Sequence, residues 1–498
     1  MTLDTAEPYF LTLDLTTGCV HEPTGDVPPN LPRFRMARTS GPDTTSYQIE
    51  PEGVRICTHW LATSPLYVLK EQEKFFFAHS IADLSHVGAL TANKSRIATL
   101  VRSKGHDGPG DPIFSSIIVA HPGDQIHVHL PSRELRVDRL PEERTSEIVA
   151  LPEGKIEDAL CSSILEMLSG ATKVAFALSG GVDSTTLAAL GNRLLSSKPL
   201  LCFTAQTHGG DDLYYAEIAA RALGADLHIV NIPTDKDALA LHAAATTAAC
   251  HPIPFSGNSI GFGAICQAAK QLGVDVIVDG TGGDPIFGGV YSLHGSYWAR
   301  AEGLDRTGTQ FQQFLEGLQK TERSKRKIAE ILREPNSRID YGLHMRREIT
   351  RGAMARWRSH HIANGRAHDV RIVMPYLNET VASFIWNEPT AFFQGGWNKA
   401  PLRRILQKYV PEEVAWRRSS QGLRWPIAPF FKQNRRTMSR YLSHSGLRQV
   451  VPMFWALGTV GALPDACFGR LYSAALAYDA AQSIYLNRHR RRAERASM

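Results

Sequence analysis

A glycine-rich turn directly after a buried strand constrains this chain more than any other feature. The apolar run Lys173–Leu178 predicts the strand, the turn Ser179–Ser184 (SGGVDS) follows it, and Thr185–Leu190 predicts a helix that begins near Ser184. Free backbone N–H groups and the positive end of the helix dipole therefore converge on the turn. The pattern predicts a cradle for a phosphate-rich anion, and the pyrophosphate of ATP fits it.

The turn is not a Walker A loop, because no Gly-Lys-Ser/Thr follows its glycines. A structural alternative is an ordinary strand–turn–helix corner, in which the glycines make the bend and Asp183 and Ser184 cap the helix. A second loop of the same kind favours ligand binding over this alternative.

The second loop, Asp279–Gly289, follows another predicted buried strand, Val274–Val278. Loops after parallel strands meet at one edge of a doubly wound sheet, which is where such sheets bind ligands. Asp183 and Asp284 are therefore expected to share a Mg²⁺ ion through their carboxylate oxygens.

The length of 498 residues implies more than one domain. In residues 1–145 short strands are predicted at 67–69, 75–78, 116–120 and 125–130. In residues 150–498 strands alternate with helices, which is the pattern of a parallel sheet; examples are a strand at 200–205 and a helix at 215–223. From about Ser296 the chain is predicted to be mainly helical, with an interruption at Met374–Leu377. The expected fold class is α/β, with a β-rich N-terminal domain, a doubly wound parallel sheet and a helical C-terminal extension.

Composition excludes several classes of protein. No apolar run approaches the roughly 20 residues of a membrane helix, and the first residues lack a signal-peptide pattern, so we expect a cytoplasmic protein without a membrane span. Seven cysteines without a Cys-x-x-Cys pair argue against zinc, iron–sulfur and sulfur-relay chemistry. They are expected to be reduced core residues: Cys19, Cys57, Cys161, Cys202, Cys250, Cys266 and Cys467.

The net charge of +6 is mild, and much of the excess lies in Arg488–Arg492. We expect this run to be the solvated end of a helix, where the helix dipole favours cations, and we expect no nucleic-acid partner. Binding of nucleic acid or of an acidic peptide by the run is the alternative.

Taken in order, short motifs along nearly the whole chain resemble those of the asparagine synthetase superfamily. The SGGVDS turn resembles the pyrophosphate loop of the ATP pyrophosphatases. Residues 1–145 resemble the later half of a class II glutamine amidotransferase domain of the Ntn type, through Ser64–Tyr67, Phe77–Ser80 and Pro122–Gly123. Residues 150–498 resemble the synthetase domain, through Asp212–Ala216, Asp279–Gly289, Val370–Arg371, Pro375–Asn378, Lys399–Arg404, Pro411–Val414 and Trp416–Arg418.

The resemblance implies ATP and Mg²⁺ as cofactors and assigns site residues. ATP would contact Leu178, Ser179, Gly180, Gly181, Asp183, Ser184, Phe203, Thr204 and Gly280. Mg²⁺ would bind Asp183 and Asp284, and the catalytic residues would be Lys399, Arg418 and Thr281. Phe203 could equally belong to the core, and Lys399 to a surface helix. The remaining candidates for a base are His251, His360 and His361, although an isolated histidine is more often structural.

Two departures from the superfamily bear on the reaction. Glutamine-dependent members have a cysteine immediately after the initiator methionine, where this sequence has Thr2. We therefore expect a degenerate amidotransferase domain and an amine that comes from the substrate. At the position of Thr281 asparagine-forming members have an acidic residue and β-lactam-forming members a tyrosine; threonine is a poor proton acceptor at neutral pH.

The segment Arg418–Gln421 (RSSQ) resembles the corresponding segment of lasso-peptide cyclases. The resemblance implies an enzyme that adenylates an Asp or Glu side chain of a precursor peptide and joins it to that peptide's N-terminal amine, releasing AMP and pyrophosphate. The implied partners are the precursor peptide, a leader-processing protease and a leader-recognition protein. The alternatives are a synthetase for a small amino acid, as in asparagine or β-lactam formation, a tRNA-modifying enzyme, and an inactive scaffold.

Overall fold

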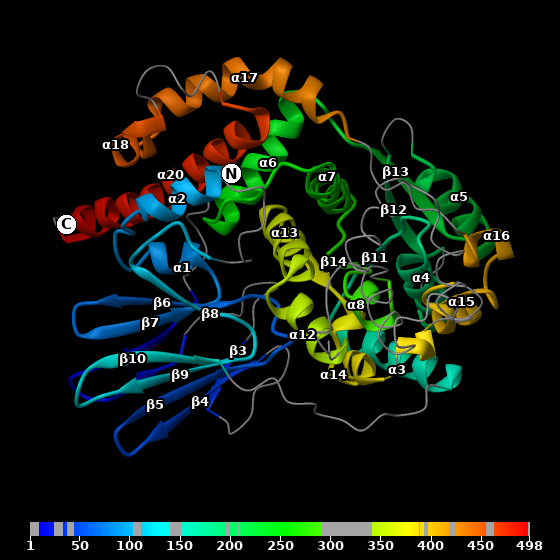
Figure 1. Cartoon of the computed structure of the whole chain (residues 1–498), viewed down its shortest axis with the longest axis horizontal. Helices are drawn as coiled ribbons and strands as arrows, with labels where there is room; N and C mark the ends of the chain where they lie inside the picture. The colour runs from blue at the N-terminus through cyan, green and yellow to red at the C-terminus, as the bar shows by residue number, and fades with distance from the viewer. Residues whose placement is uncertain are drawn as a thin grey trace, which may run out of the picture.

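The computed structural model describes residues 9–23, 33–36, 44–102, 111–139, 152–195, 199–206, 210–289, 341–387, 389–392, 397–417, 425–454 and 463–496. Within these residues three five-stranded sheets form the framework. Two lie together in the N-terminal part, and the third lies in the C-terminal part among most of the helices (Figure 1).

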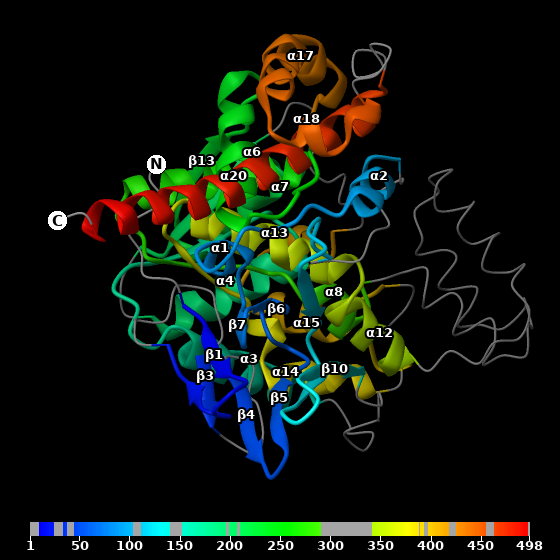
Figure 2. The same ribbon diagram turned by 90° about the vertical axis from the view of Figure 1, so that its left-hand side faces the viewer.

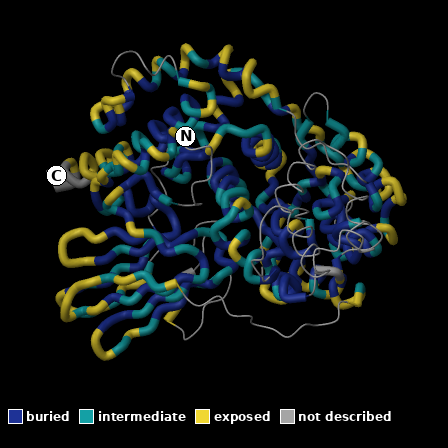
Figure 3. The backbone as a smooth tube through the Cα atoms, in the orientation of Figure 1, coloured by how far each residue is buried: buried dark blue, intermediate teal, exposed yellow. Residues whose placement is uncertain are grey.

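The two N-terminal sheets face each other across a shared apolar core that includes Leu11, Phe77, Ile56 and Ile126. The first has the order β2-β1-β7-β6-β8, made of β1 (Leu11–Asp14), β2 (Val20–His21), β6 (Leu66–Glu71), β7 (Lys74–Ala78) and β8 (Ile117–Ala120). The second has the order β10-β9-β5-β4-β3, made of β3 (Arg33–Met36), β4 (Thr44–Glu50), β5 (Gly53–Thr58), β9 (Asp124–His129) and β10 (Glu134–Arg139). Buried side chains alternate along β9, while the hairpin ends are exposed (Figure 3). The four strands predicted between residues 67 and 130 are confirmed as β6 to β9.

The C-terminal sheet is parallel throughout, with the order β13-β12-β11-β14-β15. Its strands are β11 (Val174–Ala177), β12 (Leu201–Gln206), β13 (Asp226–Asn231), β14 (Val276–Val278) and β15 (Arg371–Val373). This confirms the predicted doubly wound sheet and places β11 and β14, the strands before the two glycine-rich loops, side by side. The sequence did not indicate β15: the interruption predicted at Met374–Leu377 is a short 3-10 turn, η1 (Pro375–Leu377), directly after this fifth strand.

Helices cover both faces of the parallel sheet. On one face α4 (Val182–Leu194) packs with α3 (Glu153–Met167), α5 (Asp212–Leu223) and α15 (Ala400–Leu406). On the other lie α7 (Gly257–Gln271) and α13 (Ala353–Ala367), with α6 (Lys236–Ala249) beside them. Shorter elements complete this part: α8 (Gly283–Phe287), α12 (Tyr341–Thr350), α14 (Glu379–Ala382), η2 (Ser383–Trp386), η3 (Pro389–Phe392) and α16 (Glu412–Ala415).

The C-terminal extension joins the two parts. It consists of α17 (Ile427–His444), α18 (Leu447–Val450), η4 (Pro452–Phe454) and the long α20 (Asp465–Ala496), which runs past α1 (Ile81–Ser85), α2 (Lys94–Arg102) and α6 (Figure 2). Phe114 stacks on Tyr478 with ring centroids 6.3 Å apart, and Gln482 donates to the carbonyl oxygen of Leu90 at 2.8 Å. Arg488–Arg492 lies near the end of α20, which confirms the predicted helix end.

The seven cysteines are all free thiols. Cys161, Cys202, Cys250 and Cys266 are buried as predicted. The prediction is wrong for Cys19, which is exposed because it follows the turn after β1, and Cys57 and Cys467 are only partly buried. No helix of the described residues combines the length and the apolar composition needed to cross a membrane.

Candidate active site

The SGGVDS turn connects β11 to α4 at the carboxyl edge of the parallel sheet. Leu178, the residue before the turn, is fixed to the neighbouring strand: its N–H donates to the carbonyl oxygen of Phe203 in β12 at 2.8 Å. The hydroxyl groups of Ser179 and Ser184 are hydrogen-bonded to each other at 2.9 Å. Gly180 has a φ of +70°, and a Cβ there would lie 2.6 Å from the backbone nitrogen of Ala216. Only glycine therefore fits this position, because a side chain would collide with the first turns of α5.

The first turn of α4 lacks a side-chain cap. Gly181 is the N-cap residue, and no side chain accepts a hydrogen bond from the first N–H groups of the helix. Instead, the Ser184 hydroxyl accepts from the backbone N–H of Ser179 at 3.1 Å. The capping alternative for Asp183 and Ser184 is thus not what the structure contains. The uncapped N–H groups are oriented as in helix N-termini that bind anions.

The second loop touches the first. Gly280 lies against the backbone of Ser184, and at Gly283 a Cβ would collide with the carboxylate of Asp183. From the next element, η1, the Tyr376 hydroxyl donates to the carbonyl oxygen of Asp183 at 3.0 Å. The loops after β11, β14 and β15 therefore meet around Asp183.

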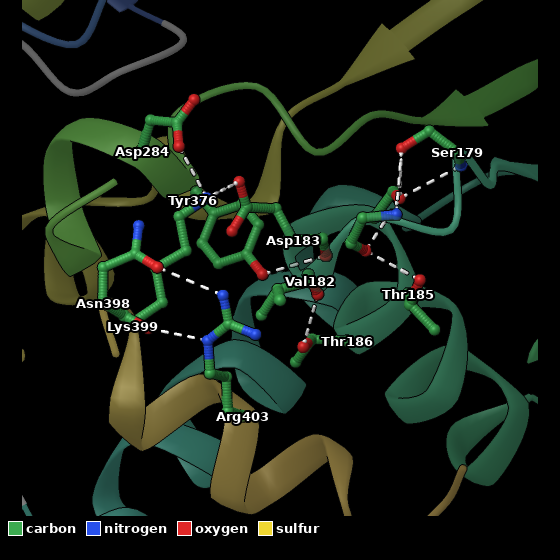
Figure 4. A network of polar contacts seen from close by, with 12 residues as sticks. Ser179, Val182, Asp183, Thr185, Thr186, Asp284, Tyr376, Asn398, Lys399 and Arg403 are labelled. Atoms are coloured by element: carbon green, nitrogen blue, oxygen red, sulfur yellow. Dashed lines mark hydrogen bonds and ion pairs between the residues drawn. The ribbon is translucent and has the colours of Figure 1, made fainter. Parts of the chain in front are cut away.

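Lys399 joins the two aspartates that the sequence placed at one site. Its Nζ lies 2.5 Å from Oδ2 of Asp183 and 2.6 Å from Oδ1 of Asp284 (Figure 4). The ammonium group is buried, and its residue stands immediately before α15 with a φ of +53°, which is uncommon for a residue with a side chain. The surface-helix alternative for Lys399 is wrong, because Lys399 is buried and α15 packs against α3 and α4.

Burial and charge act against each other in this cluster. Burial opposes protonation of Lys399, but Asp183 and Asp284 outweigh it and hold the pKa of the ammonium above its usual range. Burial raises the pKa of Asp183 to about 6, against the attraction of Lys399. At neutral pH the Lys399 ammonium consequently lies beside an ionised Asp183.

The donor set of this cluster fits Mg²⁺ bound together with phosphate. Oδ1 of Asp183 is buried and has no hydrogen-bond partner, while the Asp284 side chain is about half exposed, at 52%. Among the described residues no three His, Cys, Asp or Glu side chains are grouped closely enough to hold a metal by themselves. Mg²⁺ is commonly bound through one or two carboxylates plus phosphate oxygens of a substrate, which is the arrangement that Asp183 and Asp284 could complete.

Thr281, at the start of the second loop, belongs to a hydrogen-bonded triad. Its hydroxyl donates to Oδ2 of Asp279 at 2.6 Å, and Nδ1 of His361 lies 2.7 Å from the same oxygen. The ring of His361 stacks on Phe262, with centroids 4.0 Å apart. Burial alone would raise the pKa of Asp279, but His361 and the hydrogen bonds hold it below its usual value. An ionised Asp279 favours the tautomer in which Nδ1 carries the proton, so that Nε2 of His361 can accept one.

The other two candidate bases are structural. Burial lowers the pKa of His251 to about 4 and that of His360 to about 3, so both imidazoles are neutral interior groups. Of the three histidines singled out in the sequence, His361 is the one that the fold brings to the glycine-rich loops.

The residues expected near adenosine occupy two different places. The Phe203 ring is buried in the core and packs on His228 at 5.2 Å, which is the core alternative that the sequence left open. Thr204 is buried in β12 beside it. Gly280, in contrast, lies where the two loops meet.

Arg418 falls in the segment 418–424, outside the described residues. Its neighbour Arg417 is buried and holds the pyrophosphate-type turn: Nη1 donates to the carbonyl oxygen of Gly180 at 3.0 Å and Nη2 to Oδ1 of Asp212 at 2.6 Å. The guanidinium also lies over the Tyr215 ring at 4.3 Å. The sequence analysis included Arg417 in a motif but gave it no role, because nothing local to Trp416–Arg418 indicates a contact with Gly180.

The SGGVDS turn lies at the carboxyl edge of a parallel sheet, next to two aspartates that Lys399 bridges. This arrangement is typical of the nucleotide-binding sites of doubly wound sheets. The sequence model of the asparagine synthase family matches residues 155–475, and the chain belongs to this family.

Two curated proteins are similar to parts of the chain. The chain is 24% identical over 248 residues to a putative glutamine-hydrolysing asparagine synthetase of Methanocaldococcus jannaschii, over 48% of this chain and 42% of that protein. It is 30% identical over 150 residues to the amidase chry2 of Gibberella zeae, over 27% of this chain and 22% of that protein. The alignments thus span less than half the length of either relative.

Proposed function

We propose that this protein is an ATP-dependent, amide-forming enzyme that releases AMP and pyrophosphate. The observation that carries the proposal is the Asp183–Lys399–Asp284 cluster beside the SGGVDS turn at the carboxyl edge of the parallel sheet. An uncapped helix N-terminus, an ammonium group and two carboxylates suit the polyphosphate of ATP better than an uncharged ligand.

The chain's own residues divide the work. Ser179–Ser184 and the first N–H groups of α4 bind the pyrophosphate part of ATP, and Lys399 neutralises phosphate charge. Asp183 and Asp284 would hold Mg²⁺, which would supply additional neutralisation of the developing negative charge. Once the carboxylate has displaced pyrophosphate, His361 takes the proton that the attacking amine loses as the amide bond forms and AMP leaves, while Asp279 orients the imidazole.

The proposed substrate is a peptide that supplies both the Asp or Glu carboxylate and the N-terminal amine, as in lasso-peptide biosynthesis. Two sequence features outside the described residues support this choice, Thr2 and the segment Arg418–Gln421. A third is Thr281, whose hydroxyl is occupied by Asp279 and leaves base chemistry to His361. With this substrate, the proposed partners are the precursor peptide, a leader-processing protease and a leader-recognition protein.

A small-molecule synthetase is the second candidate, favoured by the relative named as an asparagine synthetase. It would share the ATP site and the His361–Asp279 pair. The two candidates differ only in the acyl substrate and in the source of the amine.

The deciding experiment incubates the full chain with ATP, Mg²⁺ and a leaderless precursor peptide encoded beside its gene. We expect AMP, pyrophosphate and a peptide lighter by one water. Acetylating the peptide's N-terminus should abolish closure while pyrophosphate release continues. ADP and phosphate as products would contradict the whole proposal, whereas efficient use of aspartate with no reaction of the peptide would replace the cyclase by the small-molecule synthetase.

A further inference from the structure

Arg358 is a buried cation outside the cluster described above. It lies on α13 with 2% of its surface exposed, among the largest fully buried side chains of the described residues. Its Nη1 donates to the carbonyl oxygen of Leu61 at a long 3.5 Å, and its Nε has no hydrogen-bond partner. No carboxylate of the described residues forms an ion pair with it, although a guanidinium has five N–H groups to donate.

The position of Arg358 follows from the direction of α13. The helix packs against β15, and only three residues separate its end at Ala367 from the start of the strand at Arg371. Within this short connection the N–H of Val370 donates to the carbonyl oxygen of Gly365 at 2.9 Å, so the chain reverses and the helix runs antiparallel to the strand. His361 bonds Asp279, which marks the carboxyl edge of the sheet. Arg358 precedes His361 by three residues, about 4.5 Å along the helix axis, and therefore lies beyond that edge, on the ligand side.

A loop of the N-terminal part covers this place. Leu61 and Ala62, between β5 and β6, are buried, and Leu61 belongs to the same apolar core as the parallel sheet. The loop is held on both sides: the Arg346 guanidinium of α12 lies over the Trp60 ring at 5.3 Å, and Nε2 of His59 lies 3.7 Å from the carboxylate of Glu379. Arg358 thus sits beneath a fixed lid that offers it a carbonyl oxygen but no anion.

A buried guanidinium without a counter-ion is costly to the folded protein. Burial lowers its pKa to about 10, so it is still charged at neutral pH. A bound anionic ligand would supply the missing negative charge. ATP has its own cations in Lys399 and Mg²⁺, which leaves the acyl substrate as the anion for Arg358.

We propose that Arg358 binds the carboxylate of the acyl substrate under the Trp60–Ala62 loop, one helical turn from His361. This inference rests on the proposed function for the identity of the carboxylate as the one that is activated. It also gives the N-terminal part a role that needs no glutamine hydrolysis: its loop closes the acyl-binding site.

The test uses sodium butyrate, which has the side-chain carboxylate of glutamate without its backbone, and butyramide as the neutral control. The full chain, Arg358→Met and Arg358→Lys are compared by thermal unfolding with increasing concentrations of each compound. Arg356→Met, on the same helix and only partly buried, is the matched control variant.

In the wild-type protein and in Arg356→Met, butyrate should raise the unfolding temperature and butyramide should not. In Arg358→Met the half-saturating butyrate concentration should rise about 10- to 100-fold, the value of a charge-assisted hydrogen bond, with Arg358→Lys in between. Without butyrate, Arg358→Met should unfold at the same or a higher temperature, because an uncompensated charge has been removed.

Two results would overturn the inference. The first is that butyrate and butyramide have the same effect on the wild-type protein. The second is an unchanged butyrate response in Arg358→Met, or an unchanged butyrate response in Arg358→Lys if Arg358→Met fails to fold. A lower unfolding temperature of Arg358→Met together with an unchanged butyrate response would make Arg358 a structural tie to Leu61. Failure of the proposed function looks different. Butyrate would then still bind through Arg358, but no substrate would yield AMP and pyrophosphate.

Discussion

The two sheet systems of this protein use polar side chains in opposite ways. In the N-terminal sheets all paired strands except β3 and β4 are antiparallel, so neighbouring strands mostly end at opposite edges and no edge gathers the loops of several strands. The buried polar groups there are scattered, as in the pair formed by the Thr45 hydroxyl and Nε2 of His79 at 2.7 Å. In the parallel sheet every strand ends at the same edge. Asp183, in the loop after β11, therefore lies at the same edge as Asp279 and Asp284, in the loop after β14.

The comparison teaches that the ligand site is a property of strand direction as much as of residue type. A buried charged group of the N-terminal part contacts the C-terminal part: Asp124, the first residue of β9, forms an ion pair with Arg351, which follows α12. This ion pair ties the N-terminal sheets to the part of the chain that carries the site.

The largest expected effect compares the carboxylates of Asp183 and Asp284 at the ligand edge with the buried carboxylate of Asp124 in the N-terminal part. Asp183→Asn or Asp284→Asn should lower substrate-dependent pyrophosphate release at least about 100-fold, because each removes charge from a site that holds Mg²⁺ and phosphate oxygens. Asp124→Asn should destabilise the fold and leave the rate per folded molecule within a few-fold. Near-normal release by either Asp183→Asn or Asp284→Asn would break the comparison.

A smaller effect compares the two ends of one strand. Gly170 precedes β11 with a φ of +74° and open space around it, whereas Gly180 follows β11 with a φ of +70° and a close contact to α5. Gly170→Ala should cost about 1 kcal/mol from the left-handed backbone alone and leave ATP binding unchanged. In Gly180→Ala the new Cβ would also collide with the backbone of α5, so calorimetric titration with Mg²⁺-ATP should show an affinity about 10-fold or more below that of the wild-type protein. If Gly180→Ala bound Mg²⁺-ATP as tightly as Gly170→Ala, the turn would not be the phosphate-binding element.

The last prediction concerns stability in acid. Burial lowers the folded-state pKa of His242 and His360 to about 3 and that of His251 to about 4, and all three belong to the C-terminal part. The unfolded chain takes up these protons below pH about 6.5 and the folded chain does not, so stability is complete above that pH and is lost as the pH falls toward 4. The three together give a slope of up to about 4 kcal/mol per pH unit.

In the described N-terminal residues His79 behaves in the same way, with a pKa of about 4. Asp83 opposes it, because burial raises its pKa to about 6 and its cost to the folded state therefore appears as the pH rises. Asp183, with a pKa of about 6, opposes the three histidines of the C-terminal part in the same way. We therefore expect the C-terminal part to unfold first in acid, which denaturant titrations between pH 7 and 4.5 would check. His360→Phe should reduce the slope by about one third, while the change of the exposed His444 to Gln should not. An unchanged slope in His360→Phe would contradict the assignment.

Sequence and structure agree best where the signal is local. The strand, turn and helix around Ser179–Ser184 are encoded by a short run of residues, and the structure contains β11 and α4 at that place. In the same way the alternation of strands and helices indicated the doubly wound sheet. The fifth strand, β15, was missed because Arg371–Val373 is three residues long and leads into a proline turn, which hides the strand pattern.

By itself the sequence determined the fold class and the two glycine-rich loops with Asp183 and Asp284, because backbone preference and hydrophobic periodicity act over a few neighbouring residues. Only the tertiary structure decided what surrounds them. Lys399 reaches Asp183 across 216 residues of chain, Arg417 reaches Gly180 across 237, and Arg358 reaches Leu61 across 297. Such contacts depend on how the sheet, α13, α15 and the N-terminal loop pack together, and no local pattern encodes a packing between segments so far apart.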